Sequence, residues 1–73
     1  MRDQVLATLA ELTEPPPDDR APLVLDSLTT VQLVEALEAR FGFTARADEM
    51  NAANLGDLAG LVAWISRRAT RGT

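Results

Sequence analysis

Asp26, Ser27 and Leu28 form the one arrangement in this sequence whose residue types and position could do chemistry. They stand at the start of the strongest amphipathic segment, so we expect Ser27 in the first turn of a helix with its hydroxyl exposed. Free backbone N–H groups and the helix dipole favour an anion attached there, such as a phosphate ester. This placement suits covalent modification by another enzyme, although a first-turn serine is also common without any function.

The composition argues against catalysis by the chain itself. Its 73 residues include no histidine, cysteine, tyrosine or lysine. A serine nucleophile needs an activating base and an oxyanion hole, and neither histidine nor lysine is present to act as the base. Without cysteine there is no disulfide, no thiolate zinc site and no redox motif. We therefore predict no enzyme, no catalytic residue and no metal site.

The helix that must position Ser27 is predicted over 27–41. Asp26 is a good N-cap, and Gly42 supplies the stop. Leu33 widens the apolar stripe of this helix, which predicts contact with more than one neighbouring helix. The stripe itself recurs at three- and four-residue steps through Leu28, Val31, Val34, Leu37 and Phe41.

Further helices are predicted at about 3–13 and 58–69, with a short helical turn at about 48–53. A long surface loop over 14–25 contains three consecutive prolines, which end the first helix and stiffen the chain. Some of the apolar residues at 23–25 should pin this loop to the core. No segment alternates with period two, so no sheet is expected. These elements predict an all-α fold, a small four-helix bundle of three longer helices and one short helix, in a single domain over 1–73.

Three residues of the last helix carry specific expectations. Asp57 is its best N-cap, with Asn54 as the rival. Gly60 inside the helix costs about 1 kcal/mol relative to alanine, which a close packing contact would explain. Trp64 falls about 120° from the centre of the apolar stripe, so we expect it half-buried at the edge.

Charge is uneven along the sequence. The net charge is −4, yet before residue 67 there are only 4 arginines against 11 acids. An acidic body repels nucleic acid and attracts basic protein surfaces. The last arginines, Arg67, Arg68 and Arg71, suit a helix C-terminus. No stretch approaches a membrane span and no signal pattern opens the chain, so we expect a cytoplasmic protein that binds neither membrane nor nucleic acid.

The order of the motifs is more specific than any one of them. The run Leu23-Val24-Leu25-Asp26-Ser27-Leu28 precedes the predicted helix, and Phe41-Gly42-Phe43 ends it. Asp48-Glu49-Met50, Asn54-Leu55 and Asp57-Leu58 then follow in order. On these residues the chain resembles the acyl and peptidyl carrier proteins, the phosphopantetheine-binding family. It is most similar to discrete carriers of polyketide or nonribosomal peptide pathways.

The resemblance implies that a phosphopantetheinyl transferase moves the 4'-phosphopantetheine arm of coenzyme A onto Ser27. The thiol of the arm would hold an acyl or aminoacyl group as a thioester. A loading enzyme and downstream synthase enzymes with basic docking surfaces would then bind the helix that begins at Ser27. The implied recognition residues are Asp26, Leu28, Val31, Glu35 and Glu38. Glu35 and Glu38 could equally be a plain solvated face, and Leu28 and Val31 remain to be divided between core and interface.

Departures from the fatty-acid carriers narrow the expected function. Thr29 and Gln32 stand where those carriers usually have acids, and Val24 stands where many relatives have glycine. We therefore expect a free-standing, monomeric carrier of a specialised, polyketide-type pathway. The alternatives are an aminoacyl or peptidyl carrier of a nonribosomal pathway, an excised synthase domain, or an unmodified helical interaction module. A DNA-binding domain is disfavoured, because Glu35 and Glu38 outnumber Arg40 on the best helix. No residue identifies the cargo.

Overall fold

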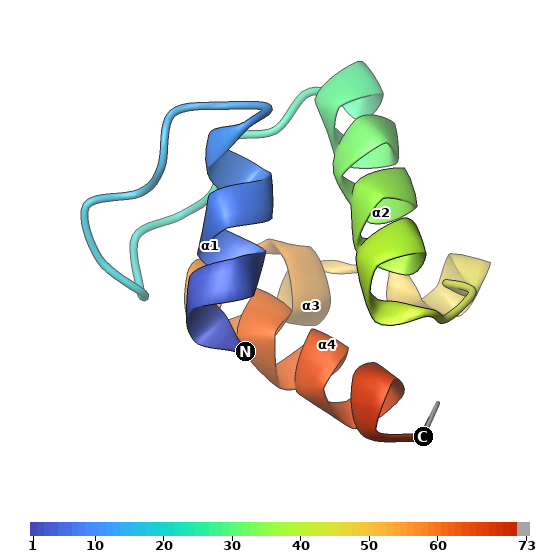
Figure 1. The fold of residues 1–73 in the computed structure, drawn as a ribbon. Helices are drawn as coiled ribbons and strands as arrows, with labels where there is room; N and C mark the ends of the chain where they lie inside the picture. The colour runs from blue at the N-terminus through green and yellow to red at the C-terminus, as the bar shows by residue number, and fades with distance from the viewer. Residues whose placement is uncertain (72–73) are drawn as a thin grey trace.

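The computed structural model describes residues 1–71 of the chain, and the side chains of 1–69. The elements are α1 (Arg2–Ala10), α2 (Ser27–Phe41), the 3₁₀ turn η1 (Ala47–Glu49), α3 (Ala52–Leu55) and α4 (Leu58–Arg71). α1, α2 and α4 contact one another pairwise, and α3 packs on α4 (Figure 1). Within the described range there is no strand, only an isolated bridge between Pro22 and Asp57. The predicted all-α fold is confirmed.

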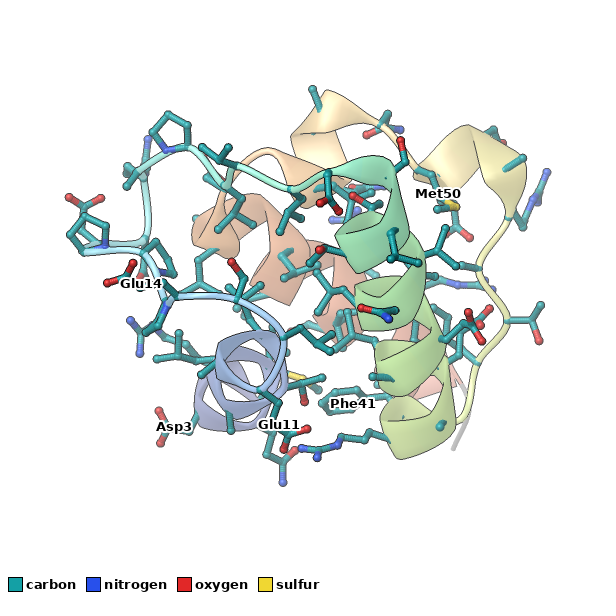
Figure 2. The ribbon with its side chains drawn as sticks, turned by 90° about the horizontal axis from the view of Figure 1, so that it is seen from above. Asp3, Glu11, Glu14, Phe41 and Met50 are labelled. Carbon is teal, nitrogen blue, oxygen red and sulfur yellow. The ribbon has the colours of Figure 1, made fainter. Side chains whose placement is uncertain are left out.

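The core lies where α1, α2 and α4 meet. α2 faces it with Leu33, Val34 and Leu37, and Phe41 lies between α1 and α2 at its margin (Figure 2). The buried apolar residues are Val5, Leu9, Leu33, Val34, Leu37, Leu58, Leu61, Trp64 and Ile65. Burial of these side chains is the main stabilising contribution available to a chain without disulfides. None of the helices in the described part is long and apolar enough to cross a membrane.

The bounds of α2 agree with the prediction over 27–41. The Asp26 carboxylate accepts a hydrogen bond from the Thr29 backbone N–H at 2.7 Å, as an N-cap does. Gly42 ends the helix with φ 70° and ψ 46°, a left-handed conformation that glycine adopts without strain. Both ends of the helix that positions Ser27 are therefore determined by adjacent residues.

α1 is shorter than predicted, because it ends at Ala10 and not near residue 13. The backbone N–H groups of Leu12 and Thr13 both bond to the Leu9 carbonyl, which tightens the last turn. Pro15 follows soon after. It has no N–H to continue the helix, and it disfavours helical geometry at the residue before it.

The predicted turn over 48–53 is wrong in its extent, because two separate pieces occupy the region. η1 ends at Glu49, and α3 begins only after Asn51. The Asn51 side chain accepts from the Asn54 backbone N–H at 3.1 Å, and so caps the second piece. Asparagine competes with helix continuation by bonding to nearby backbone groups.

The structure selects Asp57 over Asn54 as the cap of α4. Its carboxylate accepts from the Gly60 N–H at 2.7 Å, whereas Asn54 lies inside α3. The close packing contact that would explain Gly60 is present, since a Cβ there would lie 2.2 Å from the Ala53 carbonyl oxygen. α4 runs two residues beyond the predicted 69, to Arg71.

The expectation that Trp64 is half-buried is wrong. The side chain is only 1% exposed. The segment between α2 and α3 folds over this side of α4, so Phe43 meets the indole edge-on at 5.7 Å between ring centres. The indole N–H donates to the Glu49 carboxylate at 3.0 Å. Periodicity within α4 gave no sign of this cover, because the cover comes from a different part of the chain.

The first loop is attached to the rest of the fold at Asp19, near the middle of the loop, and at Leu23. Arg2 forms a bidentate ion pair with Asp19, its closest approach 2.6 Å. Backbone hydrogen bonds join the Ala59 N–H to the Asp19 carbonyl and the Leu23 N–H to the Gly56 carbonyl. Of the three apolar residues at 23–25, the outer two pack on the core and the middle one, Val24, is 91% exposed. The expectation that one or two of them pin the loop is confirmed.

Candidate modification site at the start of α2

Ser27 is the first residue of α2 and is exposed. The first hydrogen bond within the helix runs from the Thr30 N–H to the Asp26 carbonyl at 2.9 Å. The N–H groups of Ser27 and Leu28 precede that bond, so helix geometry provides them with no acceptor inside the helix. An anion attached to the serine oxygen would lie at the positive end of a 15-residue helix.

Asp26 is bound into the helix and is not a free surface acid. The hydrogen bond from the Thr29 backbone lowers the pKa of the Asp26 carboxyl below its ordinary value of 3.8, because the N–H stabilises the charged form. Asp26 thus stays ionised at neutral pH and holds the first turn. Ser27, the next residue, remains exposed to solvent.

The exposed face of α2 continues from Ser27 with little charge. Leu28 is 67% exposed and Val31 is 47% exposed, so both lie at the surface and outside the core. Helical spacing puts Glu35 on the same face, and it is also exposed. Three of the five implied recognition residues therefore share one accessible face with Ser27.

Glu38 follows on the same side of α2 by helical spacing, but it is half-buried and already accepts a hydrogen bond. Its carboxylate accepts from the Ala45 backbone N–H at 2.7 Å, which holds the chain that leaves α2. Arg40 on the same helix pairs with Glu11 of α1 at 2.7 Å and donates to Thr8 at 3.1 Å. These charged groups of α2 are occupied by contacts within the fold.

Val24 lies at the surface three residues before Ser27, an exposure that its residue type did not distinguish from that of Leu23 and Leu25. The inward positions of Leu23 and Leu25 on either side of it follow the two-residue alternation of an extended chain, and that alternation was the available signal. In the part of the chain that the structure describes, no group of three or more acidic, histidine or cysteine side chains is placed to hold a metal ion.

Comparison with known proteins gives the family. A family model described as the phosphopantetheine attachment site matches residues 3–62, most of the chain, including all of α2 and α3 and all of α1 except its first residue. The chain therefore belongs to this family of carrier domains, which bind 4'-phosphopantetheine covalently and are not themselves enzymes. Searches of curated proteins and of solved structures found no match.

The residues at the start of α2 fit such an arm. A phosphodiester carries a negative charge, which is costly to bury, so the hydroxyl that bears it must be accessible. Ser27 is exposed and meets this requirement. The N–H groups of Ser27 and Leu28 at the start of the helix are the donors that such a charge would use. Carriers of this family interact with a phosphopantetheinyl transferase and with synthase enzymes.

Proposed function

We propose that Ser27 is the attachment residue and that the chain carries an acyl or aminoacyl group for a specialised, polyketide-type pathway. The observation that carries this proposal is an exposed serine hydroxyl at the first position of a capped 15-residue helix, inside the matched family region. The departures at Thr29 and Gln32 support a specialised pathway over primary fatty-acid synthesis.

Attachment requires the serine oxygen to displace a phosphate leaving group. The Ser27 oxygen bonds to the phosphorus next to pantetheine in coenzyme A, the diphosphate bond breaks, and adenosine 3',5'-bisphosphate leaves. The hydroxyl proton passes to a base of the transferase, since this chain has no histidine or lysine to accept it. When attached, the arm supplies the thiol that holds the cargo as a thioester.

The surroundings of Ser27 support the partner roles implied for α2. Leu28, Val31 and Glu35 offer two apolar contacts and one acid on the accessible face. Asp26 and Glu38 complete the proposed recognition set, the first by shaping the start of the helix and the second by holding its far end. We propose that basic surfaces on the loading and synthase enzymes meet this face, and that the carrier acts as a monomer.

The test of attachment is the intact mass after incubation with coenzyme A, magnesium and a promiscuous phosphopantetheinyl transferase. We expect a gain of one phosphopantetheine on the wild-type chain and no gain on Ser27→Ala. Ser66 is the other serine in the sequence, so Ser66→Ala is the matched control and should gain the arm.

The stability of the same variants makes the result interpretable. Because Ser27 is exposed, Ser27→Ala should change the free energy of unfolding by under about 1 kcal/mol. Arm attachment to Ser27→Ala would remove the proposal. No gain on a folded wild-type chain, with a known carrier modified alongside, would favour an unmodified interaction module.

A further inference from the structure

The first loop encloses an open hollow that the proposed function does not use. Its volume is about 450 Å³. Figure 2 shows the loop, with Glu14 on it, extending to one side of the bundle. The walls are the two limbs of the loop, contributed by Thr13, Glu14, Pro15, Pro16, Pro17, Pro22, Leu23, Val24 and Leu25.

The prolines explain why the two limbs do not close on each other. Limbs that run in opposite directions could pair as a hairpin, but the run 15–17 has no backbone N–H to donate. The turn between the limbs is held by Asp18, which accepts from the N–H groups of Arg20 and Ala21 at 2.9 and 2.8 Å. The bond from the Ala59 N–H to the Asp19 carbonyl fixes the second limb to α4, and the bond from the Leu23 N–H fixes it to Gly56, the residue after α3. The hollow is thus supported from outside by the bundle.

The walls favour a small ligand that has both apolar and hydrogen-bonding parts and no negative charge. Four prolines and Val24 share the lining with polar groups, Thr13 among its residues, whereas Leu23 and Leu25 also pack on the core. Of the described residues around the hollow, only Glu14 carries a charge, and it is exposed. A carboxylate there repels an acidic ligand and attracts an ammonium group.

The hollow begins beside the proposed attachment residue. Leu25 is in its wall and stands two residues before Ser27, a separation of at most about 7 Å along extended chain. A flexible arm attached to the Ser27 oxygen therefore starts at the edge of the hollow. It would enter the hollow by running back alongside the loop toward lower residue numbers.

We propose that this loop hollow seats the end of the phosphopantetheine arm together with a small aminoacyl cargo, whose ammonium group faces Glu14. The inference rests on Ser27 as the attachment residue. It favours an aminoacyl cargo, which carries an ammonium group, over a three-carbon acyl cargo that carries a carboxylate.

Nuclear magnetic resonance of the loaded chain tests the location. The transferase attaches an arm that ends in an alanyl group through a stable amide, and the spectrum is compared with that of the chain bearing the free arm. We expect methyl shifts at Leu23, Val24 and Leu25 and at Thr13. Shifts at Met50 and α3 with an unchanged loop would overturn the proposal, and so would no shift at all. Failure of attachment is a separate result, seen in the intact mass.

Two substitutions test the walls. Val24→Trp should fill the opening and abolish the loop shifts, whereas Ala39→Trp, an equally bulky change at an exposed position of α2, should retain them. Glu14→Gln should speed spontaneous hydrolysis of the alanyl thioester roughly two- to fivefold, the range that one exposed ion pair gives. Asp3→Asn, which removes a 98% exposed carboxylate on α1, should leave that rate unchanged. Equal hydrolysis rates in wild type and Glu14→Gln would contradict the aminoacyl assignment.

Discussion

Glu49 joins two segments that lie far apart in the sequence, the turn after α2 and the last helix, α4. Its carboxylate accepts from the Trp64 indole at 3.0 Å and from the Arg46 backbone N–H at 2.9 Å, and it lies 3.3 Å from the Arg68 guanidinium. Arg68 in turn stacks over Phe43, 5.5 Å from the ring centre. These contacts, the Trp64 hydrogen bond foremost, lower the pKa of Glu49 below its ordinary value of 4.5. The ionised carboxylate is therefore the form that the fold binds.

The lowered pKa of Glu49 predicts a loss of stability in acid. A carboxyl whose pKa is lower in the folded state contributes stability that is fully present above its unfolded pKa, and this is lost as the pH falls through the folded value. We expect the urea midpoint, followed by Trp64 fluorescence, to fall as the pH drops from 7 to below 4.5. Glu49→Gln should lower the midpoint at pH 7 and flatten this dependence.

Asp3→Asn is the control for Glu49→Gln, because the Asp3 carboxylate is almost fully exposed. Its midpoint should follow the wild-type curve. The same pH slope in Glu49→Gln as in the wild-type chain would mean that Asp19 and Asp26, whose pKa values are also lowered, account for the acid sensitivity.

At the scale of elements, α3 and α4 approach each other through a glycine. The Ala53 carbonyl oxygen would lie 2.2 Å from a Cβ at Gly60, which is too close for any side chain. The contact involves backbone on α3, so a flexible side chain cannot move aside to relieve it. Gly60 therefore sets how near the short helix lies to the last one.

Gly60→Ala should destabilise the chain by about 1–3 kcal/mol, because the added methyl forces the two helices apart. An isolated helix would respond in the opposite way, since alanine is favoured over glycine by about 1 kcal/mol. Chemical denaturation measures the difference.

Ala63→Gly, at an exposed position of the same helix, provides the comparison for Gly60. It should lose about 1 kcal/mol from helix propensity alone. A Gly60→Ala chain more stable than wild type would show that α3 can move away without loss.

At the scale of the whole molecule, acids of α2 have separate roles. Glu35 is exposed on the face that carries Ser27, whereas Glu38 holds the Ala45 N–H at 2.7 Å. The bonds of Arg40 to Glu11 and Thr8 likewise join α2 to α1. Charge reversal at Glu35 should therefore affect partners, and charge reversal at Glu38 should affect the fold.

Glu35→Arg should leave the thermal midpoint near that of wild type and slow turnover by a partner enzyme, with a smaller defect at high salt. Glu38→Arg should lower the midpoint, because the Ala45 N–H loses its acceptor. Thermal melting and a loading assay at two salt concentrations separate the two effects. Full activity of Glu35→Arg with its native partner would place the docking surface elsewhere.

Much of the region around Ser27 was predictable from the sequence, because neighbouring residues determine it. The bounds of α2, its Asp26 cap and its Gly42 end depend on local periodicity and capping. The sequence did not predict that Leu28 and Val31 lie outside the core. Apolar residues occupy more than one side of α2, and only the packed neighbours show which side is buried.

The sequence by itself determined the helical class, the helix that presents Ser27 and the absence of residues suited to catalysis, since these follow from composition and short-range spacing. Tertiary structure alone decided the burial of Trp64, the hydrogen bonds of Glu38 and Glu49, and the shape of the proline-lined hollow. The contacts of Trp64 and Glu49 depend on groups brought together from distant segments, and the Glu38 bond and the hollow depend on how the chain turns after α2 and within the first loop. The pieces η1 and α3 were also decided in this way, because helices so short depend on tertiary contacts for their stability.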